Sequence, residues 1–203
     1  MRSTCMKNVS IEKLELIICG SSDGGLQIYK ELLTALPADF PLPLVIVQHL
    51  HKSTHNNLLS LFSSSLNTIK FAADNEPLQA GHIYFAPANY HLLFEDRKTI
   101  ALSIDEAVNY SRPSIDVSMI SAADIFRASV LAILLSGANS DGSRGMEAIH
   151  KNGGTTIIQD LQDSHNPYMP QSAFKKIEPD YIMNIHEIIL FIKTMLPGEE
   201  DDE

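Results

Sequence analysis

The sequence of 203 residues has no apolar run long enough to span a bilayer, and no apolar segment of a secretory signal follows its first residues. It has only two cysteines, Cys5 and Cys19. The second lies in an apolar run, which predicts a reduced, buried thiol. Basic residues are also few, since 15 Lys and Arg stand against 25 Asp and Glu for a net charge of −10. These deficits argue against binding to nucleic acid and against membrane insertion, and they predict a soluble, cytoplasmic protein.

The remaining composition is that of an ordinary globular protein, with 44% hydrophobic and 20% charged residues. The length corresponds to about one domain that can bury a core without disulfides or metals. No internal repeat and no second domain is evident. We expect an N-terminal arm at 1–13, a single folded domain at 14–196 and a disordered acidic tail at 197–203.

Apolar runs of strand length alternate along the chain with segments of helical periodicity. Strands are expected at 15–19, 44–47, 71–73, 130–135 and 155–159, and helices at 24–36, 54–65, 114–126, 142–151, 171–177 and 186–195. The runs at 81–87, 91–94 and 99–104 are expected to form an antiparallel meander. This order predicts an α/β fold, namely a doubly wound, mostly parallel sheet with one antiparallel hairpin excursion.

Three of the apolar strands end in polar turns, and each turn holds a residue type that acyl transfer needs. Ser22 follows the first strand in a Gly-x-Ser-x-Gly spacing typical of a nucleophile elbow. His49 follows the second strand, and Asp141 follows the strand at 130–135. Because the carboxyl ends of parallel strands share one sheet edge, we expect the three side chains to meet there. Serine would be the nucleophile, histidine its base and aspartate the group that orients the imidazole.

Each of these residues also has a structural alternative. Ser22 and Asp141 each stand just before a predicted helix, where either would serve as an N-cap. His49 would be a partly exposed histidine at a strand end. The placement of all three at strand ends favours the catalytic interpretation over the three separate ones.

The segments around these residues resemble the catalytic domain of the CheB family, the chemotaxis receptor methylesterases. The similarity runs in order through nearly all of residues 14–190. The matching segments include 18–25, 45–49, 83–87, 112–117 and 134–146. By this resemblance the family's catalytic serine falls on Ser22 rather than on Ser21, its histidine on His49 and its aspartate on Asp141.

The resemblance implies a serine hydrolase that removes methyl groups from glutamate γ-methyl esters on chemoreceptor proteins, without metal or cofactor. It also implies glutamine deamidation through the same acyl-enzyme. Methylated chemoreceptors would be its partners. Separate receiver or kinase signalling proteins are further candidate partners, and control by a receiver domain within the chain is not expected, since only a short arm precedes residue 14.

Two departures from the family pattern bear on the chemistry. Asp23 stands where the family usually has threonine, and its negative charge would oppose the oxyanion that develops beside Ser22. Ala138 and Asn139 stand in a run that is typically Gly-Met-Gly, whose backbone is thought to contribute to the oxyanion hole. These changes leave the three proposed residues in place and bear on rate and substrate choice.

Alternative interpretations remain open. His49, His51 and His55 resemble the start of a metallohydrolase ligand set, although further ligands are not evident at a recognisable spacing. A catalytically weakened receptor-binding or signalling module is the non-enzymatic alternative. Arg112 is a candidate for substrate contact or for an ion pair with the acidic residues 105–106, outside the catalytic set.

Overall fold

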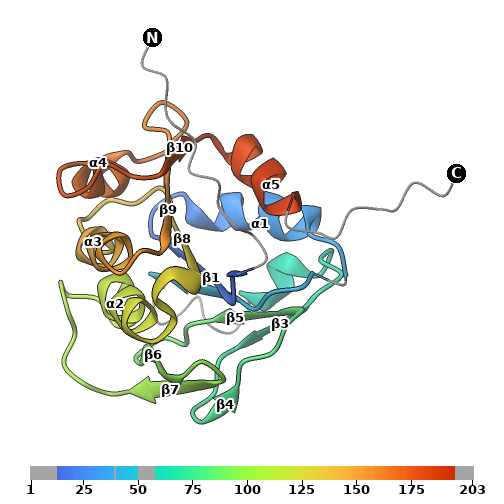
Figure 1. Ribbon diagram of the computed structural model, residues 1–203. Coiled ribbons are helices and arrows are strands. Elements are labelled where there is room, and N and C mark those ends of the chain that lie inside the picture. The colour runs from blue at the N-terminus through green and yellow to red at the C-terminus, as the bar shows by residue number, and fades with distance from the viewer. Residues whose placement is uncertain (1–12, 39, 50–57, 195–203) are drawn as a thin grey trace, which may run out of the picture.

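A seven-stranded parallel sheet organises the residues that the computed structural model describes, 13–38, 40–49 and 58–194 (Figure 1). The strands follow the order β10-β9-β8-β1-β2-β5-β3, and each neighbouring pair is parallel. They are β1 (Leu16–Ser21), β2 (Leu44–Gln48), β3 (Thr68–Phe71), β5 (His82–Phe85), β8 (Val130–Leu134), β9 (Thr155–Gln159) and β10 (Tyr181–Met183). The first strand lies in the middle and the chain adds strands on both sides, which confirms the doubly wound prediction.

Helices cover both faces of this sheet (Figure 1). They are α1 (Gly25–Ala35), α2 (Ile115–Phe126), α3 (Ser143–Lys151), α4 (Tyr168–Phe174) and α5 (Ile185–Lys193), with short 3₁₀ turns η3 (Leu59–Phe62) and η4 (Arg127–Ser129). Within the described ranges, no helix combines the length and apolar character that a membrane crossing requires.

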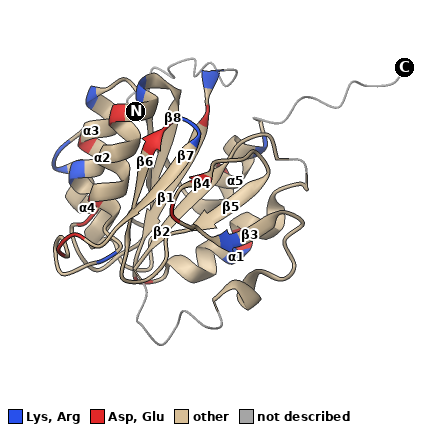
Figure 2. Cartoon of the chain, turned by 90° about the horizontal axis from the view of Figure 1, so that it is seen from below, with Lys and Arg blue, Asp and Glu red and all other residues tan. Residues whose placement is uncertain are grey.

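Alternate residues of each central strand feed two separate cores, because successive strand side chains point to opposite faces. Leu16 and Ile18 of β1 pack with α2, α3 and α4, whereas Ile17 and Cys19 pack with α1 and α5. With both faces covered, β1, β2, β5 and β8 carry no Asp, Glu, Lys or Arg (Figure 2). Burial raises the pKa of the Cys19 thiol well above its usual range, and the free, buried thiol expected from the sequence is confirmed.

The prediction of a three-part antiparallel meander is wrong for its first part. Residues 82–85 form β5, which pairs in parallel with β2 and β3 in the main sheet. Ile83, Tyr84 and Phe85 are all buried, so this run has no solvent face and belongs inside a covered sheet. Only β6 (His91–Asp96) and β7 (Thr99–Ser103) form the antiparallel hairpin, to which the short β4 (Glu76–Pro77) adds.

Other predicted elements lie close to their observed positions, with three differences. The helix expected at 171–177 is α4, which begins earlier, at Tyr168. Its first turn includes Pro170, which is tolerated there because the N–H groups of a first turn make no intrahelical hydrogen bond. Of the helix expected at 54–65, residues 58–65 hold only the 3₁₀ turn η3, and the rest lies outside the described residues. The short strand expected at 71–73 lies earlier in the chain, as β3, and shares only Phe71 with the expected range. The arm and the acidic tail lie outside the described ranges except for residue 13, and stay predictions.

At Gly145, α3 lies so close to α2 that there is no room for a side chain. A Cβ added there would lie 2.5 Å from Met119 Cβ and 3.3 Å from Asp116 Cα. We therefore expect Gly145→Ala to destabilise the protein by about 1–3 kcal/mol, although alanine favours an isolated helix. Urea denaturation measures the change, with the exposed neighbour Arg144→Ala as the control. A Gly145→Ala protein at least as stable as wild type would contradict the close packing.

Candidate active site at the carboxyl edge of the sheet

Three neighbouring strands, β8, β1 and β2, bring the predicted residues to one edge of the sheet. Ser21 pairs with Gln48 in register, so Ser22 and His49 each follow directly after the paired strand ends. The His49 N–H donates to Ser21 O at 3.2 Å, and the Ser22 N–H donates to Ser136 O at 2.9 Å, beyond the end of β8. The expectation that these strand ends meet is thus confirmed.

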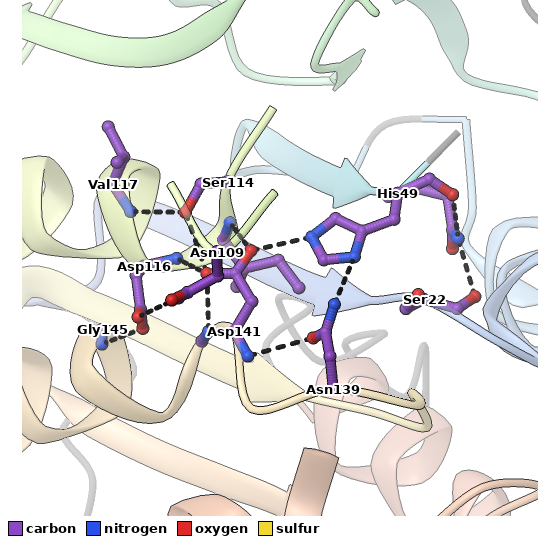
Figure 3. Close-up of polar contacts among 12 residues, drawn as sticks. Ser22, His49, Asn109, Ser114, Asp116, Val117, Asn139, Asp141 and Gly145 are labelled. Atoms are coloured by element: carbon purple, nitrogen blue, oxygen red, sulfur yellow. Dashed lines mark hydrogen bonds and ion pairs between the residues drawn. The ribbon is translucent and has the colours of Figure 1, made fainter. Parts of the chain in front are cut away.

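The His49 imidazole and the Asp141 carboxylate form a direct pair (Figure 3). His49 Nε2 lies 2.7 Å from Asp141 Oδ2, across 92 positions of sequence. The Asp141 side chain has no exposed surface, and that of His49 is 13% exposed. An ionised carboxylate only accepts hydrogen bonds, so the Nε2 atom carries a proton, and in the neutral imidazole the lone pair is then on Nδ1.

The N-terminus of α2 holds the Asp141 carboxylate in its ionised form. Besides His49, four groups donate to it at 2.7–3.1 Å: the Ser114 hydroxyl and the backbone N–H groups of Ile115, Asp116 and Gly142. Burial acts to raise the pKa of Asp141, but the bonds from His49 and from the Asp116 and Ile115 N–H groups outweigh it. The pKa therefore lies below its ordinary value, as expected for a carboxylate at a helix N-terminus.

The alternative that Asp141 caps its own helix is not what the structure shows. The N-cap of α3 is Gly142, without a side-chain capping bond, and the amides of α3 are met instead by Asp116 of α2. Asp116 Oδ1 accepts from the N–H groups of Arg144 and Gly145 at 2.9 and 2.8 Å. The N-terminus of α2 thus binds Asp141, which lies just before α3, and the N-terminus of α3 binds Asp116 of α2. Burial raises the pKa of Asp116, as does the nearby Asp141 charge, against the lowering effect of the Gly145 N–H.

The two serines after β1 have different environments. Ser21 is fully buried, and its Oγ lies 2.5 Å from Gln48 Oε1 and 2.9 Å from Tyr29 Oη. Ser22 is partly exposed, and no hydrogen bond joins its side chain to another described residue. The N-cap of α1 is Gly24, with φ 84° and no side-chain cap, so Ser22 does not cap this helix. The left-handed Gly24 turn instead carries the chain from Ser22 into α1.

Gln48 ties the ends of β1 and β2 together. Its Nε2 donates to Ser22 O at 2.7 Å and to His49 O at 3.0 Å, while its Oε1 accepts from Ser21. This side chain is nearly fully buried. It fixes the backbone of the candidate nucleophile relative to that of the candidate base.

Asn139 makes a contact that the sequence did not indicate. Its Oδ1 accepts from the Asp141 N–H at 3.0 Å, which turns its Nδ2 toward His49 Nδ1 at 3.3 Å (Figure 3). Asn139 therefore donates to the ring nitrogen on the opposite side from Asp141. In the sequence, Asn139 stands out only as a departure in the loop, because a contact between segments 90 positions apart leaves no local pattern.

Asp23 directs its carboxylate to the loop between β9 and α4. Its Oδ2 lies 3.4 Å from Asn166 Nδ2 and 3.9 Å from His165 Nε2, and the side chain is 53% exposed. The Asp23 charge is therefore open to solvent although it follows Ser22 directly.

The remaining candidates have other surroundings. The Arg112 guanidinium donates to the backbone oxygens of Ile104 and Asp105 at 2.6 and 2.8 Å, so it closes the loop before α2. His51 and His55 lie outside the described residues. Within the described ranges, no three His, Cys, Asp or Glu side chains gather as a metal site. Gln48 and Asn139 are site residues that sequence reasoning missed, as is Ser114, the N-cap of α2, whose hydroxyl also donates to Asp141.

Comparison with solved structures identifies the fold. It is similar to the crystal structure of the Thermotoga maritima CheB methylesterase catalytic domain, with a TM-score of 0.85 and 29% identity over 90% of this chain and 99% of that one. The fold is that of a methylesterase catalytic domain. A family model described as CheB methylesterase matches residues 17–192. The chain belongs to this family of carboxylic ester hydrolases, as its sequence resemblance predicted.

Curated relatives agree with this assignment. A Leptospira interrogans protein is 39% identical over 181 residues, which are 88% of this chain and 94% of that protein. A Thermotoga maritima protein named protein-glutamate methylesterase/protein-glutamine glutaminase is 31% identical over 178 residues. That match covers 86% of this chain and 52% of the relative, so the chain spans about half the length of that protein.

Proposed function

We propose that the protein hydrolyses glutamate γ-methyl esters with Ser22 as nucleophile, His49 as general base and Asp141 as the group that orients the imidazole. The observation that carries the proposal is the 2.7 Å pair between His49 Nε2 and the buried, ionised Asp141. This pair leaves the Nδ1 lone pair of His49 to take a proton at the strand end where Ser22 lies.

The reaction proceeds through an acyl-enzyme. Ser22 Oγ attacks the γ-carbonyl carbon while its proton passes to His49 Nδ1, and methanol leaves with that proton. Water then attacks the acyl-enzyme, giving His49 a proton that returns to Ser22 as the free glutamate departs. With glutamine as substrate the same steps release ammonia, which is the second activity in the Thermotoga maritima relative's name.

Two pairs of backbone N–H groups, one directly after Ser22 and one in the loop after β8, are suited to stabilise the oxyanion. Among the described residues, the N–H groups of Asp23, Gly24, Ala138 and Asn139 have no hydrogen-bond acceptor. Those of Asp23 and Gly24 stand at the start of α1, where the helix dipole adds positive potential. A backbone donor survives the change of side chain at Ala138 and Asn139.

The substrates we propose are methylated chemoreceptor proteins in the cytoplasm, with receiver or kinase signalling proteins as further partners. Family membership and the relatives' names support the substrate class. The net charge of −10 and the buried, reduced Cys19 agree with a cytoplasmic protein that binds no nucleic acid. Methanol release from methylated receptor by the wild-type protein, with Ser22→Ala as the blank, tests the proposal. Equal release by both proteins would refute it.

A catalytically weakened receptor-binding module is the second candidate function. Two observations favour it: Asp23 carries a charge next to Ser22, and Asn139 already occupies His49 Nδ1. Turnover separates the two functions, because the weakened module would bind methylated receptor with a wild-type affinity and release methanol no faster than Ser22→Ala.

Asp23→Thr is expected to raise kcat/KM by about 2- to 5-fold, because it removes a charge that opposes the oxyanion. The effect is modest because the carboxylate is 53% exposed, and it should shrink as ionic strength rises. Asp23→Asn is the matched control, since it removes the charge and keeps the side-chain shape. A gain in Asp23→Thr alone would assign the effect to shape, and no gain in either variant would contradict the electrostatic explanation.

A further inference from the structure

Asn139 is held by two hydrogen bonds that leave its amide one orientation. Asp141 N–H donates to Asn139 Oδ1 at 3.0 Å, so the oxygen faces that N–H and the NH₂ group faces His49. Asn139 Nδ2 then lies 3.3 Å from His49 Nδ1. The other ring nitrogen is bound to Asp141, so both nitrogens of the His49 ring have a hydrogen-bond partner.

The nitrogen that Asn139 occupies is the one that the chemistry needs. A neutral imidazole nitrogen has one in-plane lone pair and forms one strong hydrogen bond with it. Ser22 can pass its proton to Nδ1 only when that lone pair is free. The described residues show the consequence: Asn139 bonds to His49 Nδ1, and the Ser22 side chain has no hydrogen bond to the imidazole.

We propose that Asn139 is a positioning residue that occupies His49 Nδ1 and keeps Ser22 unactivated until the amide is displaced. The inference rests on the proposed roles of Ser22 and His49. A glycine, which the family pattern has at this position, lacks the amide and cannot hold the base in this way. The contact between Asn139 and His49 therefore makes Ser22 less reactive than it would be with the other site residues alone.

A purely structural role for Asn139 has a different signature. The bond from the Asp141 N–H braces the loop between β8 and α3, and any acceptor at position 139 would serve. The bond to His49 needs a donor. Asn139→Asp separates the two roles, because it keeps an acceptor for the Asp141 N–H and removes the donor to Nδ1. Its carboxylate would also favour a proton on Nδ1, which a base must lack.

A fluorophosphonate probe measures the resting reactivity of Ser22 directly. Ser22 Oγ attacks phosphorus, its proton passes to His49 Nδ1 and fluoride leaves, so labelling needs the free base and no receptor. Mass spectrometry of the full chain locates the adduct and gives the second-order labelling rate. Asn139→Ala and Asn139→Gly are expected to label about 3- to 10-fold faster than wild type, a ratio that corresponds to the free energy of one hydrogen bond. Asn139→Asp is expected to label more slowly than wild type.

Two further measurements distinguish the outcomes. Nitrogen NMR of the His49 ring is expected to show that Nδ1 loses a hydrogen bond in Asn139→Ala. The control variant is Asn152→Ala, which removes an amide bonded to Ala148 O and is expected to match wild type in both measurements. Folded Asn139→Ala at or below the wild-type labelling rate, or Asn139→Asp at the wild-type rate, would overturn the inference alone. Labelling that persists in Ser22→Ala would overturn the proposed function as well.

Discussion

Ser22→Ala is expected to lower methyl-ester hydrolysis by about 10⁴- to 10⁶-fold, because alanine removes the attacking oxygen and leaves only substrate binding and the oxyanion donors. The Ser22 side chain bonds to no other described residue, so its loss should leave stability unchanged. Methanol release from methylated receptor measures the activity, and thermal denaturation checks the fold. A large loss of activity at an unchanged melting temperature would separate a chemical role from a structural one.

Ser21→Ala is the matched control, since this serine is adjacent in sequence and belongs to the same turn. Its hydroxyl is buried between Gln48 and Tyr29, so its removal should cost about 1–2 kcal/mol of stability. Hydrolysis should stay within a few-fold of wild type, because Ser22 remains. If Ser21→Ala lost as much activity as Ser22→Ala, the assignment of the nucleophile would be wrong.

Asp141→Asn is expected to lower hydrolysis by about 10³- to 10⁴-fold, by reversing the imidazole tautomer. The Oδ1 site accepts from Ser114, Asp116 and Gly142, whereas the Oδ2 site accepts from His49 and Ile115. An asparagine has one side-chain oxygen, which would occupy the Oδ1 site because more donors face that site. Its NH₂ group would then face His49 Nε2. That nitrogen would then have to accept, which places the proton on Nδ1, where the Ser22 proton must go.

Asp116→Asn is the control for this prediction. It changes a buried aspartate in the same pair of helices and keeps the backbone N–H that donates to Asp141. One amide oxygen can still accept from both Arg144 and Gly145, so we expect hydrolysis within about 5-fold of wild type. The double variant Ser22→Ala/Asp141→Asn should be no slower than Ser22→Ala, because the two residues act as a unit. Additive losses would contradict that coupling.

Local sequence was sufficient for most of the fold. The apolar runs of β1, β2, β8 and β9 and the periodicity of α1, α2, α3 and α5 predicted these elements within a few residues. Prediction failed where the local signal fits two structures. The run at 81–87 fits a hairpin with 91–94 equally well. Only the parallel pairing of β5 with β2 and the burial of its residues show that it belongs to the main sheet.

The sequence by itself determined the candidate catalytic residues and their common edge: the strand ends carry Ser22, His49 and Asp141, and parallel strands end at one edge of the sheet. Only the tertiary structure decided how these residues are held. The α2 N-terminus keeps Asp141 ionised, Gln48 joins two strand ends, and Asn139 reaches the ring nitrogen that faces away from Asp141. A hydrogen bond depends on distance and direction between atoms, and for partners up to 92 positions apart those are set by packing rather than by local sequence.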